Sequence, residues 1–297
     1  MARSERPEPE VTRMGFATLH ELERDGVRIE VSEIGGRISS LRDSTGREWL
    51  VQTGRAEPKF ELQDVRFPQG TRGGWDDCLP GIDSEPDPNV QRSGTIADHG
   101  DFWFRRWNLI ESASDRIVLG VEADDHPLRL QKTISLHADA VELGLRVHNA
   151  STDRYALLTS SHPLLTWDSG AVLEVPGVSD AHYFFGERFQ PPFDSFEAAI
   201  PPGSMSKSYL RWEGIARLRI AGSVLQIEQS TETSPWLGVC INRGLWPVDS
   251  PGPDWIALET TTSPCDLLSD AMENDTARVL EPNELVEFAT RVTFPAA

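Results

Sequence analysis

The sequence predicts an all-β protein built as a large antiparallel β-sandwich, and three observations lead to this prediction. Short runs of alternating apolar and polar residues recur along most of the 297-residue chain, as expected for strands with one buried face. The 23 glycines and 21 prolines are spread between these runs, where turns are expected. Few segments show the 3.6-residue period of an amphipathic helix.

Seven alternating runs, taken in chain order, are the clearest predicted strands. Most of them alternate apolar and polar residues, and the run 255–258 is apolar throughout. They cover residues 27–31, 128–131, 141–147, 216–220, 224–228, 255–258 and 286–292. One short helix is predicted after residue 262, with Ser263 as N-cap, Pro264 at the first helical position and Asp266 in the first turn.

Residues 13–297 are expected to form a single domain, because the chain has no repeat, no low-complexity tract and no linker rich in glycine and serine. Residues 1–12 are charged and proline-rich, so a flexible tail is expected there. The stretch from Pro58 to Arg106 is irregular and aromatic-rich. Long loops of this kind are usually functional in compact domains.

The charge balance narrows the possible partners. The chain has 28 basic and 47 acidic residues, a formal net charge of −19, which argues against nucleic acid and anionic membrane surfaces. No apolar run approaches the roughly 18 residues of a membrane span, and the first residues lack the apolar stretch of a secretory signal. Cys78, Cys240 and Cys265 have neither disulfide-framework nor metal-ligand spacing. Free thiols in a reducing cytoplasm are therefore expected.

Candidate functional residues occur at four places in the sequence. These places are a Gly-Gly pair, a His-Gly pair, a histidine before a proline at the expected end of a strand, and an acidic residue that closes an expected strand. Each has an ordinary alternative explanation: a turn residue, a residue extended before proline, a solvated strand end or, for the aromatics, core packing. The candidates are Arg72, Trp75, Asp76, His99, Arg105, His162 and Glu259.

Taken together, these motifs resemble the galactose mutarotase (aldose 1-epimerase) superfamily. The order is Arg72-Gly73-Gly74, then His99-Gly100, then His162-Pro163, then Leu258-Glu259. Residues 35–50 are similar to the N-terminal hairpin of that family, and residues 280–284 to the turn before its last strand. The resemblance covers about residues 25–295, almost the whole chain.

The resemblance implies a galactose mutarotase-like super-sandwich that interconverts the α and β anomers of a hexose or related sugar. By that resemblance, His99 holds and polarises a sugar oxygen, His162 is the general acid at the ring oxygen, and Glu259 removes the proton of the anomeric hydroxyl. Arg72 and Arg105 match substrate contacts, Arg72 resembling the Arg-Gly-Gly arginine of the hexose-6-phosphate mutarotase branch.

Ring opening of a hemiacetal needs a base and an acid, which a carboxylate and an imidazole supply without metal or cofactor. Trp75, Trp103 and Trp107 offer flat faces for sugar C–H groups, and Asp76-Asp77 would repel a phosphate. Two alternatives stay open: a carbohydrate-binding module without catalysis, or another carbohydrate-active enzyme on the same scaffold. The expected partner in every case is a small sugar.

Overall fold

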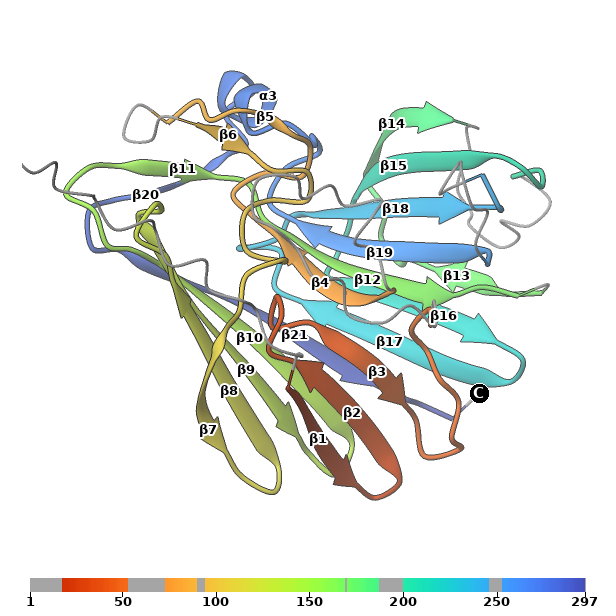
Figure 1. Cartoon of the computed structure of the whole chain (residues 1–297). Helices are drawn as coiled ribbons and strands as arrows, with labels where there is room; N and C mark the ends of the chain where they lie inside the picture. Colours follow the sequence, from red (N-terminus) through yellow and green to blue (C-terminus); the bar gives the residue numbers. More distant parts are fainter. Residues whose placement is uncertain are drawn as a thin grey trace, which may run out of the picture.

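The computed structural model describes residues 18–52, 73–89, 94–168, 170–186, 200–245 and 253–296. In these ranges the chain forms two large antiparallel sheets packed face to face (Figure 1). This confirms the predicted all-β sandwich. The expected tail at residues 1–12, and Arg72, lie outside the described residues. The described ranges hold no helix with the length and apolar character needed to span a membrane.

The first sheet carries most of the candidate residues. Its nine strands follow the order β1 (Leu19–Arg24), β2 (Val27–Ser32), β3 (Ile38–Arg42), β4 (Gly74–Cys78), β12 (Ser160–Thr166), β19 (Trp255–Thr261), β18 (Trp236–Asn242), β15 (Met205–Arg211) and β14 (Asp180–Gly186).

The second sheet covers one face of the first (Figure 1). Its eight strands follow the order β13 (Val172–Glu174), β16 (Ile215–Ile220), β17 (Ser223–Gln229), β21 (Leu285–Thr293), β10 (Ala140–Asn149), β9 (Leu128–Leu136), β8 (Arg116–Glu122) and β7 (Asn108–Ser112). Two small ladders complete the described sheets: β11 (Tyr155–Leu157) with β20 (Arg278–Leu280), and β5 (Glu85–Pro86) with β6 (Thr95–Ile96).

All seven strands predicted from alternation are present, and each extends at least one residue beyond the predicted run. The alternation also sets which side chains enter the main core between the sheets. Ile256 and Leu258 of β19 belong to that core with Leu145 and Phe288 of the second sheet. Because successive side chains of a strand point to opposite faces, Glu259 points away from the second sheet.

The predicted helix is shorter than expected and begins later. The helix α3 covers Leu268–Glu273, and no side chain caps its N-terminus. Asp266 is not an acidic residue of the first helical turn, because it precedes the helix and its carboxylate binds Lys207 at 2.9 Å. Ser263 forms a side-chain hydrogen bond with Thr276 instead of capping the helix. The prediction of a helix beginning at Pro264 was therefore wrong, since tertiary partners take up both groups.

Two local expectations about strands also change. The Ser160–Pro163 segment begins strand β12 rather than ending a strand. Glu259 lies inside β19, which continues to Thr261, and only 1% of its surface is exposed. It is therefore not a solvated strand end. A carboxylate buried this deeply needs charged or hydrogen-bonding partners.

Candidate active site

Neighbouring strands of the first sheet place the candidate residues side by side. Asp76 of β4 pairs with His162 of β12, and Glu259 of β19 pairs with Gly238 of β18. Gly238 pairs in turn with Tyr209 of β15. Residues in register on adjacent strands share a face, so these five lie on the face turned away from the main core.

His162 and Glu259 meet on this face. Nε2 of His162 lies 3.8 Å from Oε1 of Glu259, and both side chains are buried. The register between β12 and β19 is interrupted here, between Ser161 and Leu164. Pro163 explains the interruption, because proline has no N–H to donate to the ladder.

His99 reaches the same place from the loop before β7. Its ring centroid is 4.9 Å from that of His162, in an edge-on arrangement. The turn that presents it has φ values of 63° at His99 and 84° at Gly100, where glycine is favoured. The carboxylate of Asp98 lies 2.7 Å from Nδ1 of His99. That contact fixes the ring orientation and leaves Nε2 as the second ring nitrogen.

Lys207 of β15 neutralises the buried acids around Glu259. Its Nζ lies 2.9 Å from Oε2 of Glu259 and 2.9 Å from Oδ1 of Asp266. The hydroxyl of Tyr209 also donates to Asp266. None of these three residues was predicted as a site residue, because Lys207, Tyr209 and Asp266 belong to no motif and their partners are distant in sequence.

Charges and burial set the protonation states of two of these groups. Burial alone lowers the pKa of Lys207, but the charges of Asp266 and Glu259 raise it well above its usual value, so the ammonium stays charged. Burial lowers the pKa of His162 well below 6.5, and the nearby His99 and Lys207 lower it further. His162 is therefore a neutral imidazole at neutral pH.

Arg37 and Asp76 extend the site toward β3. Burial lowers the pKa of the Arg37 guanidinium, whereas the charge of Asp76 acts in the opposite direction. Position 74 has room only for glycine, since a Cβ atom there would lie 2.6 Å from the backbone oxygen of Ile38 and 3.2 Å from Cδ of Arg37. Asp76 therefore has a cation nearby, unlike a free acid in an open cleft.

The other predicted residues lie elsewhere. Trp75 is buried in the main core, where its Nε1 donates to Ser161. Asp77 also faces the second sheet and pairs with Lys132 at 2.7 Å. Of the two acids expected to repel phosphate, the structure thus places only Asp76 on the face with His162.

Arg105 binds the loop that carries His99 to a neighbouring hairpin. It donates from Nε to the carbonyl of Asp101 and from Nη2 to Asp125, between β8 and β9. Trp103 donates to the carbonyl of Asp98, and Trp107 packs in the main core. These contacts fix the shape of the His99 loop.

The three cysteines are free and buried, as expected. One of them lies in the site. The thiol of Cys78 and one ring nitrogen each of His99 and His162 lie within 4.8 Å of one another. Spacing along the sequence did not reveal this group. Burial raises the pKa of Cys78 well above its usual value, and the charges of Glu259 and Asp76 raise it further.

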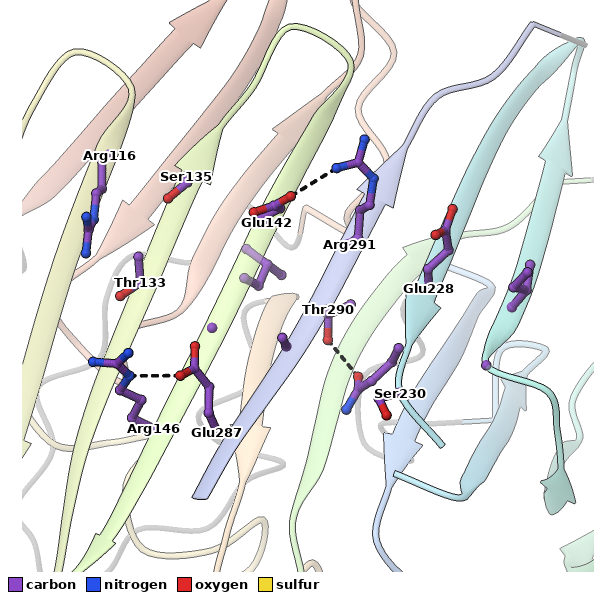
Figure 2. A pocket seen from close by; sticks show the side chains of 16 residues that line it. Arg116, Thr133, Ser135, Glu142, Arg146, Glu228, Ser230, Glu287, Thr290 and Arg291 are labelled. Carbon is purple, nitrogen blue, oxygen red and sulfur yellow. Dashed lines mark hydrogen bonds and ion pairs between the residues drawn. The ribbon is translucent and has the colours of Figure 1, made fainter. Parts of the chain in front are cut away.

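A separate hollow of about 580 Å³ lies on the outer face of the second sheet (Figure 2). Four of its charged groups are paired with one another: Arg146 with Glu287 at 2.9 Å, and Arg291 with Glu142 at 3.0 Å. None of the predicted site residues lines it. The paired charges are typical of a solvated sheet face rather than a catalytic centre.

Comparison of the whole architecture with solved structures assigns the fold. The chain superimposes on a protein from Escherichia coli K12 provisionally named aldose 1-epimerase, with a TM-score of 0.71 and 17% identity over 95% of this chain and 100% of that one. This chain has the galactose mutarotase-like fold. A galactose mutarotase related enzyme from Lactobacillus acidophilus gives a TM-score of 0.65 and 13% identity, covering 94% of this chain and 98% of that one.

A galactose mutarotase-like protein from Lactobacillus casei shows the same fold, with a TM-score of 0.63 and 15% identity over 94% of this chain and 100% of that one. No protein-family model and no curated protein matches the sequence. At these identities the galactose mutarotase-like fold is shared, and the reaction must be argued from the site.

Proposed function

We propose that this protein is an aldose 1-epimerase, an isomerase that interconverts the α and β anomers of a hexose or related sugar. The observation that supports this most directly is the pairing of a buried carboxylate with a buried imidazole. Glu259 and His162 lie 3.8 Å apart on one sheet face, and the ring of His99 lies beside His162. An acid and a base on one face are what hemiacetal opening requires.

The reaction starts at the anomeric hydroxyl. Glu259 takes the hydroxyl proton, the O–H electrons form the C1 carbonyl, and the bond from C1 to the ring oxygen breaks. His162, a neutral imidazole, gives the proton of its N–H to that oxygen as negative charge develops there, and it is left as an imidazolate until the reverse transfer re-protonates it. Rotation about the C1–C2 bond and the reverse transfers close the ring on the other face. Both residues return to their starting states.

Lys207 is a positioning residue in this proposal. Glu259 is 1% exposed, and a carboxylate buried this deeply needs a charged or hydrogen-bonding partner. The ammonium at 2.9 Å from Oε2 is that partner and fixes one of the two carboxylate oxygens. The other oxygen, Oε1, is the one on the side of His162.

The charges favour an unphosphorylated sugar. Glu259 and Asp76 lie on the sheet face with the two histidines, and Lys207 is occupied by two carboxylates. Arg72, which lies outside the described residues, remains a proposed substrate contact. Arg105 is proposed to act through the His99 loop that it binds, and Trp75 packs away from the site. The chemistry proposed needs no metal and no cofactor.

A polarimetric assay tests the proposal. The purified protein is added to freshly dissolved anomers of several free and phosphorylated hexoses, and the approach to anomeric equilibrium is followed. Acceleration of at least one free hexose above its spontaneous rate is expected. Sugar binding without acceleration would instead favour the carbohydrate-binding module.

A further inference from the structure

We propose that Cys78, His99 and His162 form a binding site for a thiophilic divalent cation, with Zn²⁺ as the fitting ion. One thiol and two imidazoles offer ligand atoms within 4.8 Å of one another. Around tetrahedral zinc, ligand atoms lie roughly 3.3–3.6 Å apart, given Zn–N distances of about 2.0 Å and Zn–S of about 2.3 Å. Small side-chain rotations therefore bring the three atoms into position.

The surroundings of His99 are those of a metal ligand. Its Nδ1 faces the Asp98 carboxylate at 2.7 Å. A carboxylate on the far nitrogen orients the ring of a zinc-bound histidine and increases its basicity. Asp98 supplies that partner at Nδ1, so the proposed ligand atom of His99 is Nε2.

The other two ligands also suit a soft cation. His162 offers an imidazole nitrogen and Cys78 a sulfur close to the proposed ligand atom of His99. Thiolate and imidazole together select zinc-like ions over magnesium or calcium. The carboxylates of Glu259 and Asp76 lie on the same sheet face and would offset the charge of an incoming cation.

His99 is the most exposed of the three proposed ligands. Its side chain is 18% exposed, whereas the side chain of His162 is 7% exposed and Cys78 is fully buried. Binding displaces the thiol proton, so affinity should rise with pH. The bound ion would occupy the two histidines that the proposed sugar reaction uses. Zinc is therefore expected to inhibit the enzyme rather than serve it.

Cobalt(II) titration tests the site without any assay of sugar chemistry. Reduced, chelator-treated protein should bind one equivalent of Co²⁺ and show a thiolate-to-cobalt charge-transfer band in the near ultraviolet, which Zn²⁺ then abolishes. Cys78→Ser should remove the band and weaken Zn²⁺ binding by at least about tenfold. Cys240→Ser, which changes another buried thiol of the same sheet, should keep both.

A second variant and an inhibition assay help to interpret the cobalt titration. Should Cys78→Ser not fold, Asp98→Asn retains all three ligands and should weaken zinc binding by about 10–100-fold. Absence of the band in the wild type, or its persistence in Cys78→Ser, would overturn the site. Inhibition of mutarotation by Zn²⁺ rests on the proposed function, whereas the cobalt spectrum does not. A band without any epimerase activity would contradict only the proposed function.

Discussion

The ammonium group of Lys207 lies 2.9 Å from Oε2 of Glu259, and both side chains are almost fully buried. Such a pair is strongly coupled, because little solvent screens the two charges. The same ammonium holds Asp266 at 2.9 Å, so one cation balances two acids. Loss of that cation should affect both the fold and the base.

Lys207→Met should lower the kcat of mutarotation by at least about tenfold, since small displacements of a catalytic group are costly. Without the ammonium, Glu259 loses the partner that fixes Oε2. The variant should also lose about 3–5 kcal/mol of stability, the usual cost of breaking a buried ion pair. Steady-state kinetics and urea unfolding measure the two effects separately.

Lys132→Met is the matched control for this change. Lys132 is also buried and pairs with a carboxylate, Asp77, at 2.7 Å, but on the face turned toward the second sheet. It should lose similar stability and keep the wild-type kcat. Equal kcat values for the two variants would show that Lys207 has only a structural role.

Gly238→Ala should lower kcat by about 10-fold to 100-fold, since small displacements of a catalytic group are costly. A Cβ atom at this position would lie 3.1 Å from both Cβ of Glu259 and Cε1 of Tyr209, and 3.4 Å from Oε2 of Glu259. Glu259 must therefore move. Steady-state kinetics measures the loss.

Gly144→Ala provides the comparison in a strand of the second sheet. Its new Cβ would approach only the end of the Glu287 side chain, at 3.3 Å, and that side chain can move aside. Wild-type kcat is expected. An unchanged kcat in Gly238→Ala would show that Glu259 is not the base or is not displaced.

Stability should fall as the pH drops below 6.5, and His162 should account for part of this loss. Its pKa in the folded protein lies well below 6.5, so between that pKa and 6.5 the unfolded chain binds a proton at this residue and the native state does not. The stability that His162 contributes is fully present above pH 6.5 and is lost as the pH falls toward the folded pKa. The slope it adds is at most about 1.4 kcal/mol per pH unit.

Urea unfolding in the presence of a chelator, between about pH 7 and pH 5, measures this slope. His162→Asn should have a shallower dependence than the wild type. His182→Asn, which changes an exposed histidine of β14, should keep the wild-type slope. A steeper dependence in His162→Asn would mean that His162 is charged in the native state.

A strong chelator should leave mutarotation unchanged or increase it. The proposed proton transfers use only Glu259 and His162, and zinc at Cys78 would compete with them. Activity is compared before and after dialysis against the chelator. Loss of activity that returns on adding a divalent ion would contradict a metal-independent reaction.

Alternation along the chain was sufficient to predict seven of the described strands and the sandwich, but not the site strands β4, β15 and β18. The alternation also predicts the sheet face to which each side chain points, and the choice of site residues did not take this into account. Trp75 and Asp76 are neighbours in β4, so a strand must send them to opposite faces. Only Asp76 shares the face of His162, whereas Trp75 joins the main core.

The partners of the predicted residues could not be inferred from spacing. Lys207 and Asp266 are 59 positions apart and come from a strand and from the segment before a short helix. Their contact depends on the order of β19, β18 and β15 in the sheet, which local patterns do not encode. The grouping of Cys78 with His99 and His162 depends on the same long-range pairing.

The central claim is that Glu259 and His162 transfer protons at an anomeric centre, and rate and affinity measured together test it most directly. Mutarotation of the best hexose is followed by polarimetry, and sugar binding by calorimetry, for the wild type, Glu259→Gln and His162→Asn. Both variants should lose about 10²-fold or more in rate with little change in affinity. A wild type that binds the sugar but never exceeds the spontaneous rate would contradict the claim.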